Sequence, residues 1–205
     1  KKITIINYGS GNIKAITNIY ELLNIPFSVA STSLELESAK KIILPGVGSF
    51  DYCMSKLNES GLKDILNRKV LEEKIPVLGI CIGLQIMANS SDEGNLSGLG
   101  WIQGKVKKFD ESKLHNKPKI PHMGWNSIQV KTTPDLFAGI DEFLGFYFIH
   151  SYYIELCNKE NIMTTTDYGG TFVSGINSAN IYAVQFHPEK SHSNGIKLLK
   201  NFLKL

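Results

Sequence analysis

The fold is constrained most by one ten-residue stretch, Pro76 to Gln85, which reads PVLGICIGLQ. Its apolar start, Val77 to Ile80, predicts a buried strand, and a helix is predicted from Ile82 to about Asn89. Cys81 lies at the corner with a glycine two residues away on each side, the spacing of a nucleophile elbow. Such a turn places the sulfur at a helix N-terminus, where free N–H groups and the helix dipole favour a thiolate. Taken alone, the pattern also fits a small buried cysteine.

The two halves of the chain predict different kinds of sheet. The first ninety residues alternate helical patterns with apolar strands at 3–6, 27–30, 41–44 and 77–80. Such alternation predicts parallel strands, whose ligands bind at their carboxyl ends. Short strands separated by turns are then predicted at 101–109, 128–131, 146–149, 162–166, 172–176 and 181–186. We therefore expect an α/β fold with a mixed, mostly parallel central sheet flanked by helices, and additional antiparallel strands in the C-terminal half. One domain should cover residues 1–205.

Composition excludes several function classes. The 205 residues carry 22 basic and 19 acidic side chains, a net charge of +3, without a basic block that would predict nucleic-acid binding. No apolar run approaches the roughly 18 residues of a membrane span. The three cysteines form no C-x-x-C pair and have no metal-ligand spacing, so we expect no metal and a reduced, cytoplasmic protein.

Two further segments bear on the chemistry of Cys81. His187, directly after the last predicted strand, could take the proton of the thiol, and Glu189 could orient its imidazole, which is the logic of a catalytic triad. The segment Pro45-Gly46-Val47-Gly48 ends another predicted strand, and its glycines would let backbone N–H groups turn toward an oxyanion. Each segment alone also fits a plain turn, but together with the elbow they favour catalysis. His150 is a candidate to line the pocket.

At this point the sequence resembles a known family. The segment GICIGLQ with a late His-Pro-Glu is similar to the class I (triad) glutamine amidotransferases. Five segments are similar, within that family, to the glutaminase subunits of imidazole glycerol phosphate synthase. They are NYGSGN at 7–12, PGVGSF at 45–50, IPHMGWN at 120–126, YFIHSY at 147–152 and HPEKS at 187–191. The resemblance covers essentially the whole chain.

The resemblance implies a catalytic role for each member of the triad. Cys81 would be the nucleophile, His187 the general base and acid, and Glu189 the orienting carboxylate. Gln85 would bind the polar groups of glutamine, and the backbone of Ser151 and Tyr152 would hold its α-amino end.

The resemblance also implies an oxyanion hole and a partner. The hole would be formed by Gly46, Val47 and Gly48 together with the N–H of Ile82, and the loop would flip into place only when the partner is occupied. Tyr147 and Lys190 would face that partner, a (β/α)8-barrel cyclase subunit that forms a heterodimer with this chain and receives ammonia. No cofactor is implied.

Three alternatives stay open. A paralogous subunit could supply ammonia to a sugar-modifying enzyme of surface-polysaccharide or flagellar-glycan synthesis. A cysteine esterase is disfavoured, because in α/β-hydrolases the acid usually precedes the histidine in sequence. A catalytically silent regulatory domain is disfavoured by the complete set of Cys81, His187 and Glu189.

Overall fold

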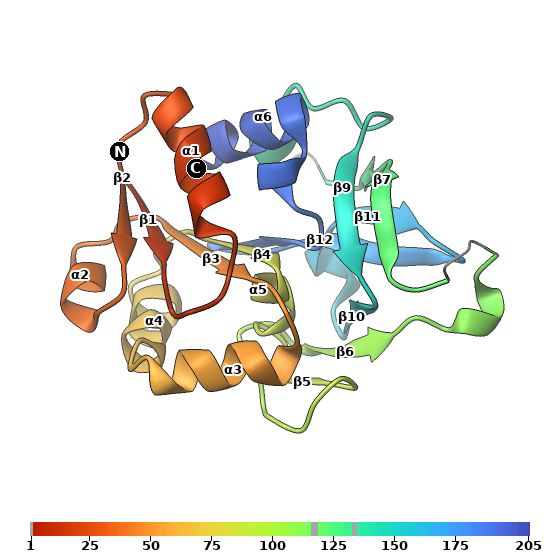
Figure 1. Cartoon of the computed structure of the whole chain (residues 1–205), viewed down its shortest axis with the longest axis horizontal. Coiled ribbons are helices and arrows are strands. Elements are labelled where there is room, and N and C mark those ends of the chain that lie inside the picture. Colours follow the sequence, from red (N-terminus) through yellow and green to blue (C-terminus); the bar gives the residue numbers. More distant parts are fainter. Residues whose placement is uncertain (1, 116–118, 133–134) are drawn as a thin grey trace.

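The computed structural model describes residues 2–115, 119–132 and 135–205. Within these ranges, eleven strands form one mixed sheet whose main path runs β2-β1-β3-β4-β13-β12-β10-β6-β5, and two more strands pair separately. Helices lie on both faces of the sheet (Figure 1). The expected fold class is therefore confirmed.

The parallel part of the sheet contains five neighbouring strands. They are β1 (Ile3–Ile6), β2 (Phe27–Ala30), β3 (Ile42–Gly46), β4 (Val77–Cys81) and β13 (Ile181–Val184). Every residue of β1, β3 and β4 is buried, as expected for parallel strands that are covered on both faces. β4 lies between β3 and β13, so the strand that precedes Cys81 is held by hydrogen bonds on both sides.

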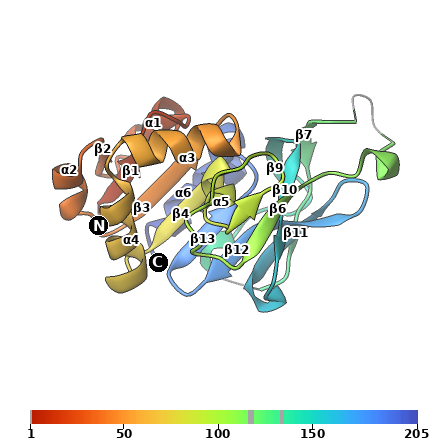
Figure 2. The ribbon, with the colours of Figure 1, turned by 90° about the horizontal axis from the view of Figure 1, so that it is seen from below.

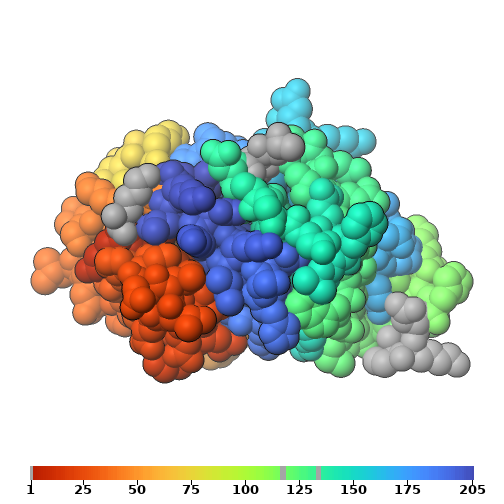
Figure 3. Space-filling model, turned by 90° about the horizontal axis from the view of Figure 1, so that it is seen from above, coloured from red at the N-terminus to blue at the C-terminus, as the bar shows by residue number. Residues whose placement is uncertain are grey.

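Helices cover the two faces of this parallel part. α1 (Ile13–Leu22) and α6 (His192–Phe202) lie side by side on one face, and Figure 3 shows them as a continuous surface next to the chain around residue 145. The opposite face carries α3 (Phe50–Glu59) and α4 (Lys63–Asn67), which continues into a π-helical turn, Arg68–Glu72. α2 (Ser33–Glu37) packs against β2 and α4.

The antiparallel part extends the sheet beyond β13 (Figure 2). Its strands are β12 (Thr171–Ser178), β10 (Tyr152–Leu156), β6 (Gly104–Lys108), β11 (Ile162–Asp167), β8 (Gln129–Val130) and the short β5 (Ser90–Ser91), which pairs with β6 in parallel. β7 (His122–Asn126) and β9 (Phe146–His150) form a separate antiparallel ribbon. Short 3-10 turns occupy Glu111–Lys113, Asp135–Phe137, Lys159–Asn161 and Pro188–Lys190.

Two local expectations were wrong. β7 and β10 were not expected as strands. The helix after Cys81, α5 (Ile82–Gln85), ends four residues early. It ends there because the carbonyls of residues 86–89 accept hydrogen bonds from N–H groups of residues 98–102 instead.

The parallel strands bring the candidate residues to one edge. In the β3–β4 register Gly46 lies opposite Cys81, and in the β13–β4 register Val184 lies opposite Ile80. The loop after β3, the elbow after β4 and the chain after β13 therefore meet at the carboxyl edge of the sheet. The helices of the described ranges are all too short or too polar to cross a lipid bilayer.

Candidate active site

Cys81 sits on a strained turn. It leaves β4 with φ 54° and ψ −111°, a left-handed conformation that side chains other than glycine rarely adopt. The positions two residues before and after it must be glycine, because neighbouring backbone leaves no room for a Cβ. A Cβ on Gly83 would lie 1.9 Å from the carbonyl oxygen of Leu44, and one on Gly79 would lie 2.9 Å from the carbonyl oxygen of Gly83. The predicted elbow is thus present in the backbone.

His187 and Glu189 form a buried pair beside this turn. His187 Nδ1 lies 2.7 Å from Glu189 Oε1, and the two side chains are only 3% and 2% exposed. The carboxylate accepts from Nδ1, which leaves the other ring nitrogen to face Cys81, whose side chain is close enough to act on His187 electrostatically. The structure therefore brings together all three residues that the sequence predicts as a triad.

The charges around His187 favour its protonated form. Burial lowers the pKa of His187, but the adjacent Cys81 thiolate and the Glu189 carboxylate outweigh burial and raise it from 6.5 to about 10. Near neutral pH His187 is then protonated, so that it is a ready proton donor.

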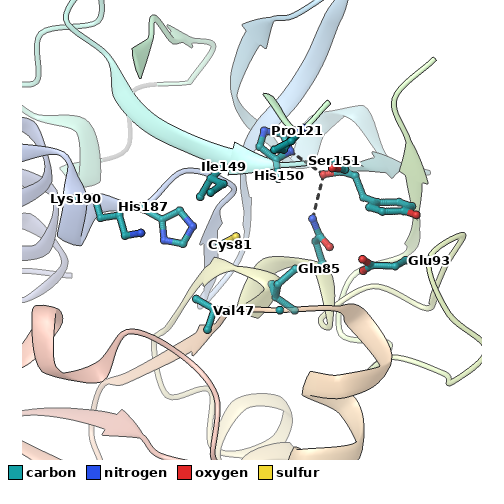
Figure 4. Close-up of a pocket in the computed structure, with 13 residues that line it drawn as sticks. Val47, Cys81, Gln85, Glu93, Pro121, Ile149, His150, Ser151, His187 and Lys190 are labelled. Atoms are coloured by element: carbon teal, nitrogen blue, oxygen red, sulfur yellow. Dashed lines mark hydrogen bonds between the residues drawn. The ribbon is translucent and has the colours of Figure 1, made fainter. Parts of the chain in front are cut away.

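A cavity of about 370 Å³ opens over the sulfur (Figure 4). It is lined by Val47, Gly48, Cys81, Ile82, Gln85, Glu93, Pro121, Ile149, His150, Ser151, Tyr152, His187 and Lys190. Most residues predicted for the site line this cavity, including His150. Gly46 and Tyr147 do not line it, but Gly46 pairs with Cys81 across β3 and β4, and the ring centre of Tyr147 lies 5.8 Å from Nζ of Lys190, which does line it.

The loop predicted as an oxyanion donor is held by Ser10. The Val47 N–H donates to Ser10 Oγ at 3.0 Å, and the Val47 carbonyl accepts from Ser10 Oγ at 2.8 Å and from Cys53 Sγ at 3.3 Å. Gly48, with φ 104°, carries the turn that follows. The Val47 N–H is therefore already hydrogen-bonded to Ser10 and is not available to a substrate in the cavity. Ile82 begins α5, so its N–H has no acceptor within that helix.

Two polar residues of the site were missed in the sequence. Glu93 lines the cavity, and its carboxylate accepts the N–H of Phe50 at 2.8 Å. Gln185 is completely buried, with Nε2 3.7 Å from Cys81 Sγ. A signal existed for Gln185, since it lies in the predicted strand 181–186, two residues before His187, and alternate residues of a strand point to the same face. The sequence offered no such signal for Glu93, which lies in a polar loop.

A cysteine elbow, a buried His–Glu pair and a cavity at the carboxyl edge of a mostly parallel sheet are together typical of hydrolases that act on amides or esters through a cysteine triad. The family model of class I glutamine amidotransferases matches residues 4–205. The chain is 48% identical to imidazole glycerol phosphate synthase subunit HisH of Leptospira interrogans, with 99% of this chain and 100% of that protein covered. It is 49% identical to subunit HisH 2 of Methanococcus maripaludis, with 98% of each covered.

Solved structures share the fold at lower identity. The structure of PurLQS from Thermotoga maritima has a TM-score of 0.73 at 18% identity and covers 99% of this chain and 97% of that one. A glutamine amidotransferase also has a TM-score of 0.73, at 16% identity, with coverage of 98% and 97%. The chain belongs to the class I glutamine amidotransferases and, within them, to the family of HisH subunits of imidazole glycerol phosphate synthase.

Proposed function

We propose that this chain is the glutaminase subunit of an imidazole glycerol phosphate synthase. It would hydrolyse glutamine to glutamate and ammonia and pass the ammonia to a cyclase subunit in histidine biosynthesis. The single observation that carries the proposal is that Cys81 and His187 line one cavity, with the Glu189 carboxylate hydrogen-bonded to His187 behind them. The names of relatives that share almost half of its residues over their full length support the pathway.

The two ends of the cavity are lined by different residues, and we assign each end a different role. Gln85, Glu93 and the chain at 151–152 surround one end of it, where they would bind the α-amino and carboxyl groups of glutamine. Cys81 and His187 lie at the other end, where the side-chain amide of glutamine would reach (Figure 4). An acceptor-rich site of this kind suits a substrate that carries an ammonium group.

The reaction would proceed through a thioester. The Cys81 thiolate attacks the side-chain carbonyl carbon of glutamine, and the charge that develops on oxygen is held by backbone N–H groups. The C–N bond then breaks while His187 donates its proton to the departing ammonia, leaving a glutamyl thioester on Cys81. His187 next takes a proton from water, the water oxygen attacks the thioester, and the C–S bond breaks to release glutamate.

The oxyanion hole would be completed only after a change in the loop. We propose that the N–H of Ile82 is one donor and that a peptide N–H of Gly46, Val47 or Gly48 is the other. Since the Val47 N–H is bonded to Ser10, the loop must rotate to present a donor to the substrate. A partner that binds the rotated conformation of the loop more tightly than the resting one would shift the loop toward the rotated conformation. The difference between the two affinities sets how strongly the enzyme is activated.

The partner would be a (β/α)8-barrel cyclase that docks over the mouth of the cavity. Tyr147 and Lys190 lie at this rim, and the nearby ribbon β7–β9 exposes the large apolar side chains of Met123 and Trp125. Exposed apolar groups at a rim are typical of protein interfaces. The three free cysteines are consistent with the cytoplasm as the compartment that we propose.

Replacement of Cys81 tests the proposal. In a complex with the histidine-pathway cyclase, Cys81→Ala should lower glutamine-dependent turnover by about a thousandfold or more, because the nucleophile is lost. Turnover with high ammonium should persist, since that chemistry belongs to the cyclase. Cys157→Ala, the same change at an exposed cysteine, is the control and should keep full activity.

Two results would contradict the proposal. Substantial glutaminase activity of Cys81→Ala would remove Cys81 from its role. Failure of the wild-type chain to pair with the histidine-pathway cyclase would instead favour the glycan-pathway paralogue.

A further inference from the structure

One backbone carbonyl beside the cavity fixes the direction of several hydrogen bonds. The Tyr152 carbonyl oxygen can only accept, and it accepts from Gln85 Nε2 at 3.1 Å and from His150 Nδ1 at 2.7 Å. Both contacts are the dashed lines in Figure 4. The amide nitrogen of Gln85 and the Nδ1 proton of His150 must therefore both point at this oxygen.

The inward branch of this network ends on the catalytic sulfur. Gln85 Nε2 also lies 3.0 Å from Gln185 Oε1, so Gln185 must present its oxygen to Gln85. Its amide nitrogen then faces Cys81 Sγ at 3.7 Å and donates to it. Gln185 is completely buried and Gln85 is 1% exposed, so water does not compete for these groups.

The outward branch reaches the ribbon β7–β9. Because His150 carries its proton on Nδ1, its Nε2 accepts from His122 Nδ1 at 3.0 Å. His122 Nε2 in turn accepts from Asn126 Nδ2 at 3.1 Å, and the same amide donates to the Asp167 carbonyl. Burial lowers the pKa of His122 to about 4 and, together with the neighbouring His122, that of His150 to about 3. Near pH 7 each ring then carries the single proton that this pattern requires.

We propose that Gln185 is a further catalytic residue, the N–H donor to the Cys81 sulfur, and that His150 and His122 position it through Tyr152 and Gln85. The inference rests on the proposed glutaminase reaction. The hydrogen bond from Gln185 should matter most in the second half of that reaction, the hydrolysis of the thioester. When water attacks the thioester, the C–S bond breaks and its electron pair returns to Sγ, where a buried N–H donor stabilises the new negative charge. The proton released by the water goes to His187, so the step is balanced.

Two variants of Gln185 separate a catalytic role from a structural one. Gln185→Met keeps the length of the side chain without its donor, and Gln185→Glu keeps an acceptor for Gln85 but puts an anion beside the sulfur. In the complex with the cyclase, both should lower kcat for glutamine hydrolysis about tenfold or more. KM should fall in parallel, because slow breakdown of the thioester retains bound substrate. Quenched samples analysed by intact mass should contain the glutamyl adduct on Cys81.

A third variant and a control complete the test. His122→Phe preserves the stacking of this ring on Phe148 and Tyr168 but removes the donor to His150. It should give the same combined fall of kcat and KM, about threefold, and it keeps the inference testable should a Gln185 variant not fold. Gln103→Glu, the same change at an exposed glutamine, should leave both constants unchanged.

The possible outcomes are distinct. A raised KM with unchanged kcat, or a lowered kcat without thioester in the quenched samples, would overturn the inference and leave Gln185 as part of the pocket wall. A wild-type complex without glutaminase activity would overturn the proposed function itself. An active wild type with fully active Gln185 and His122 variants would overturn this inference alone.

Discussion

The backbone strain of the site lies mainly in one residue. Cys81 adopts a left-handed backbone conformation, which for a residue other than glycine costs on the order of 1–3 kcal/mol. The cost is offset because β4 is anchored on both sides, by β3 and by β13. The turn then fixes the sulfur at the start of α5 and next to His187. This placement can be read from the two glycines of the elbow, whereas the partner of the sulfur on its other side, Gln185, depends on how β13 pairs with β4.

Glu189 should control the alkaline limit of activity. The wild-type rate should fall as the pH rises through about 10, because His187 then loses the proton that ammonia needs. Glu189→Gln removes a charge that raises the pKa of His187, so this fall should move to lower pH. Its amide can also donate to Nδ1 and select the wrong tautomer, and kcat should fall about a hundredfold or more.

The measurement is the pH profile of kcat for glutamine hydrolysis in the complex. Glu160→Gln, a change at an exposed carboxylate, is the control and should leave the profile in place. An alkaline limit that does not move in Glu189→Gln would show that Glu189 does not set the charge of His187.

At the scale of elements, the loop after β3 is the part of the site that we propose to rotate. Ser10, in the loop between β1 and α1, accepts the Val47 N–H and donates to the Val47 carbonyl. Ser10 Oγ also lies 3.2 Å from Cys53 Sγ on α3. The resting loop is thus fastened to two neighbouring elements, and each bond must break before a peptide N–H can face the cavity.

Ser10→Ala should raise the glutaminase activity of the chain without its partner. The variant removes both hydrogen bonds between Ser10 and Val47, and a net loss of about 1 kcal/mol from the resting loop corresponds to a gain of about fivefold in the rotated state. Activation by the partner should shrink by the same factor. Ser33→Ala, on α2, is the control. Unchanged basal turnover in Ser10→Ala would contradict a role for Ser10 in holding the loop.

The elements were predictable to different degrees, for physical reasons. The parallel strands are continuous apolar runs, so they were found with small errors at their ends. β7 was missed because HMGWN is short and has a glycine, at φ 122°, in its middle, where glycine is unfavourable in a strand. β10 was missed because Ser151 interrupts the apolar stretch that begins in β9, and the bend there separates two strands. The resting state of the loop was not predictable, since it depends on Ser10, 37 positions away from Val47.

At the scale of the whole molecule, the two halves share one core. Buried side chains of β1 and β4 in the parallel part and of β9, β10 and α6 in the C-terminal half belong to a single hydrophobic cluster. A continuous core is typical of one folding unit, and we propose that the chain is a single domain. The ribbon β7–β9 stands at the edge of that core. It therefore connects the buried network of His122 and His150 with a surface on which a partner can act.

The rim of the cavity is where hydrolysis and ammonia transfer must be coupled. Tyr147 on β9 is tied to the catalytic turn at two points, since its carbonyl accepts the His187 N–H at 2.9 Å and its N–H donates to Ser191 Oγ at 3.0 Å. Lys190 extends from the same turn, exposed, with Nζ 5.8 Å from the Tyr147 ring centre. In the function that we propose, both side chains would stand where ammonia leaves the site.

Lys190→Ala should therefore uncouple the two reactions more than it slows hydrolysis. Loss of an exposed cation–π contact and of a rim contact should change the hydrolysis rate by no more than about fivefold. Ammonia should escape through the loosened rim, so that glutamate is formed in excess of the cyclised product. Both products are measured in the same reaction with the histidine-pathway cyclase, and Lys159→Ala, at an exposed lysine between β10 and β11, is the control. If Lys190→Ala still forms glutamate and cyclised product in a one-to-one ratio, the prediction is wrong. Ammonia would then be retained without any contribution from Lys190.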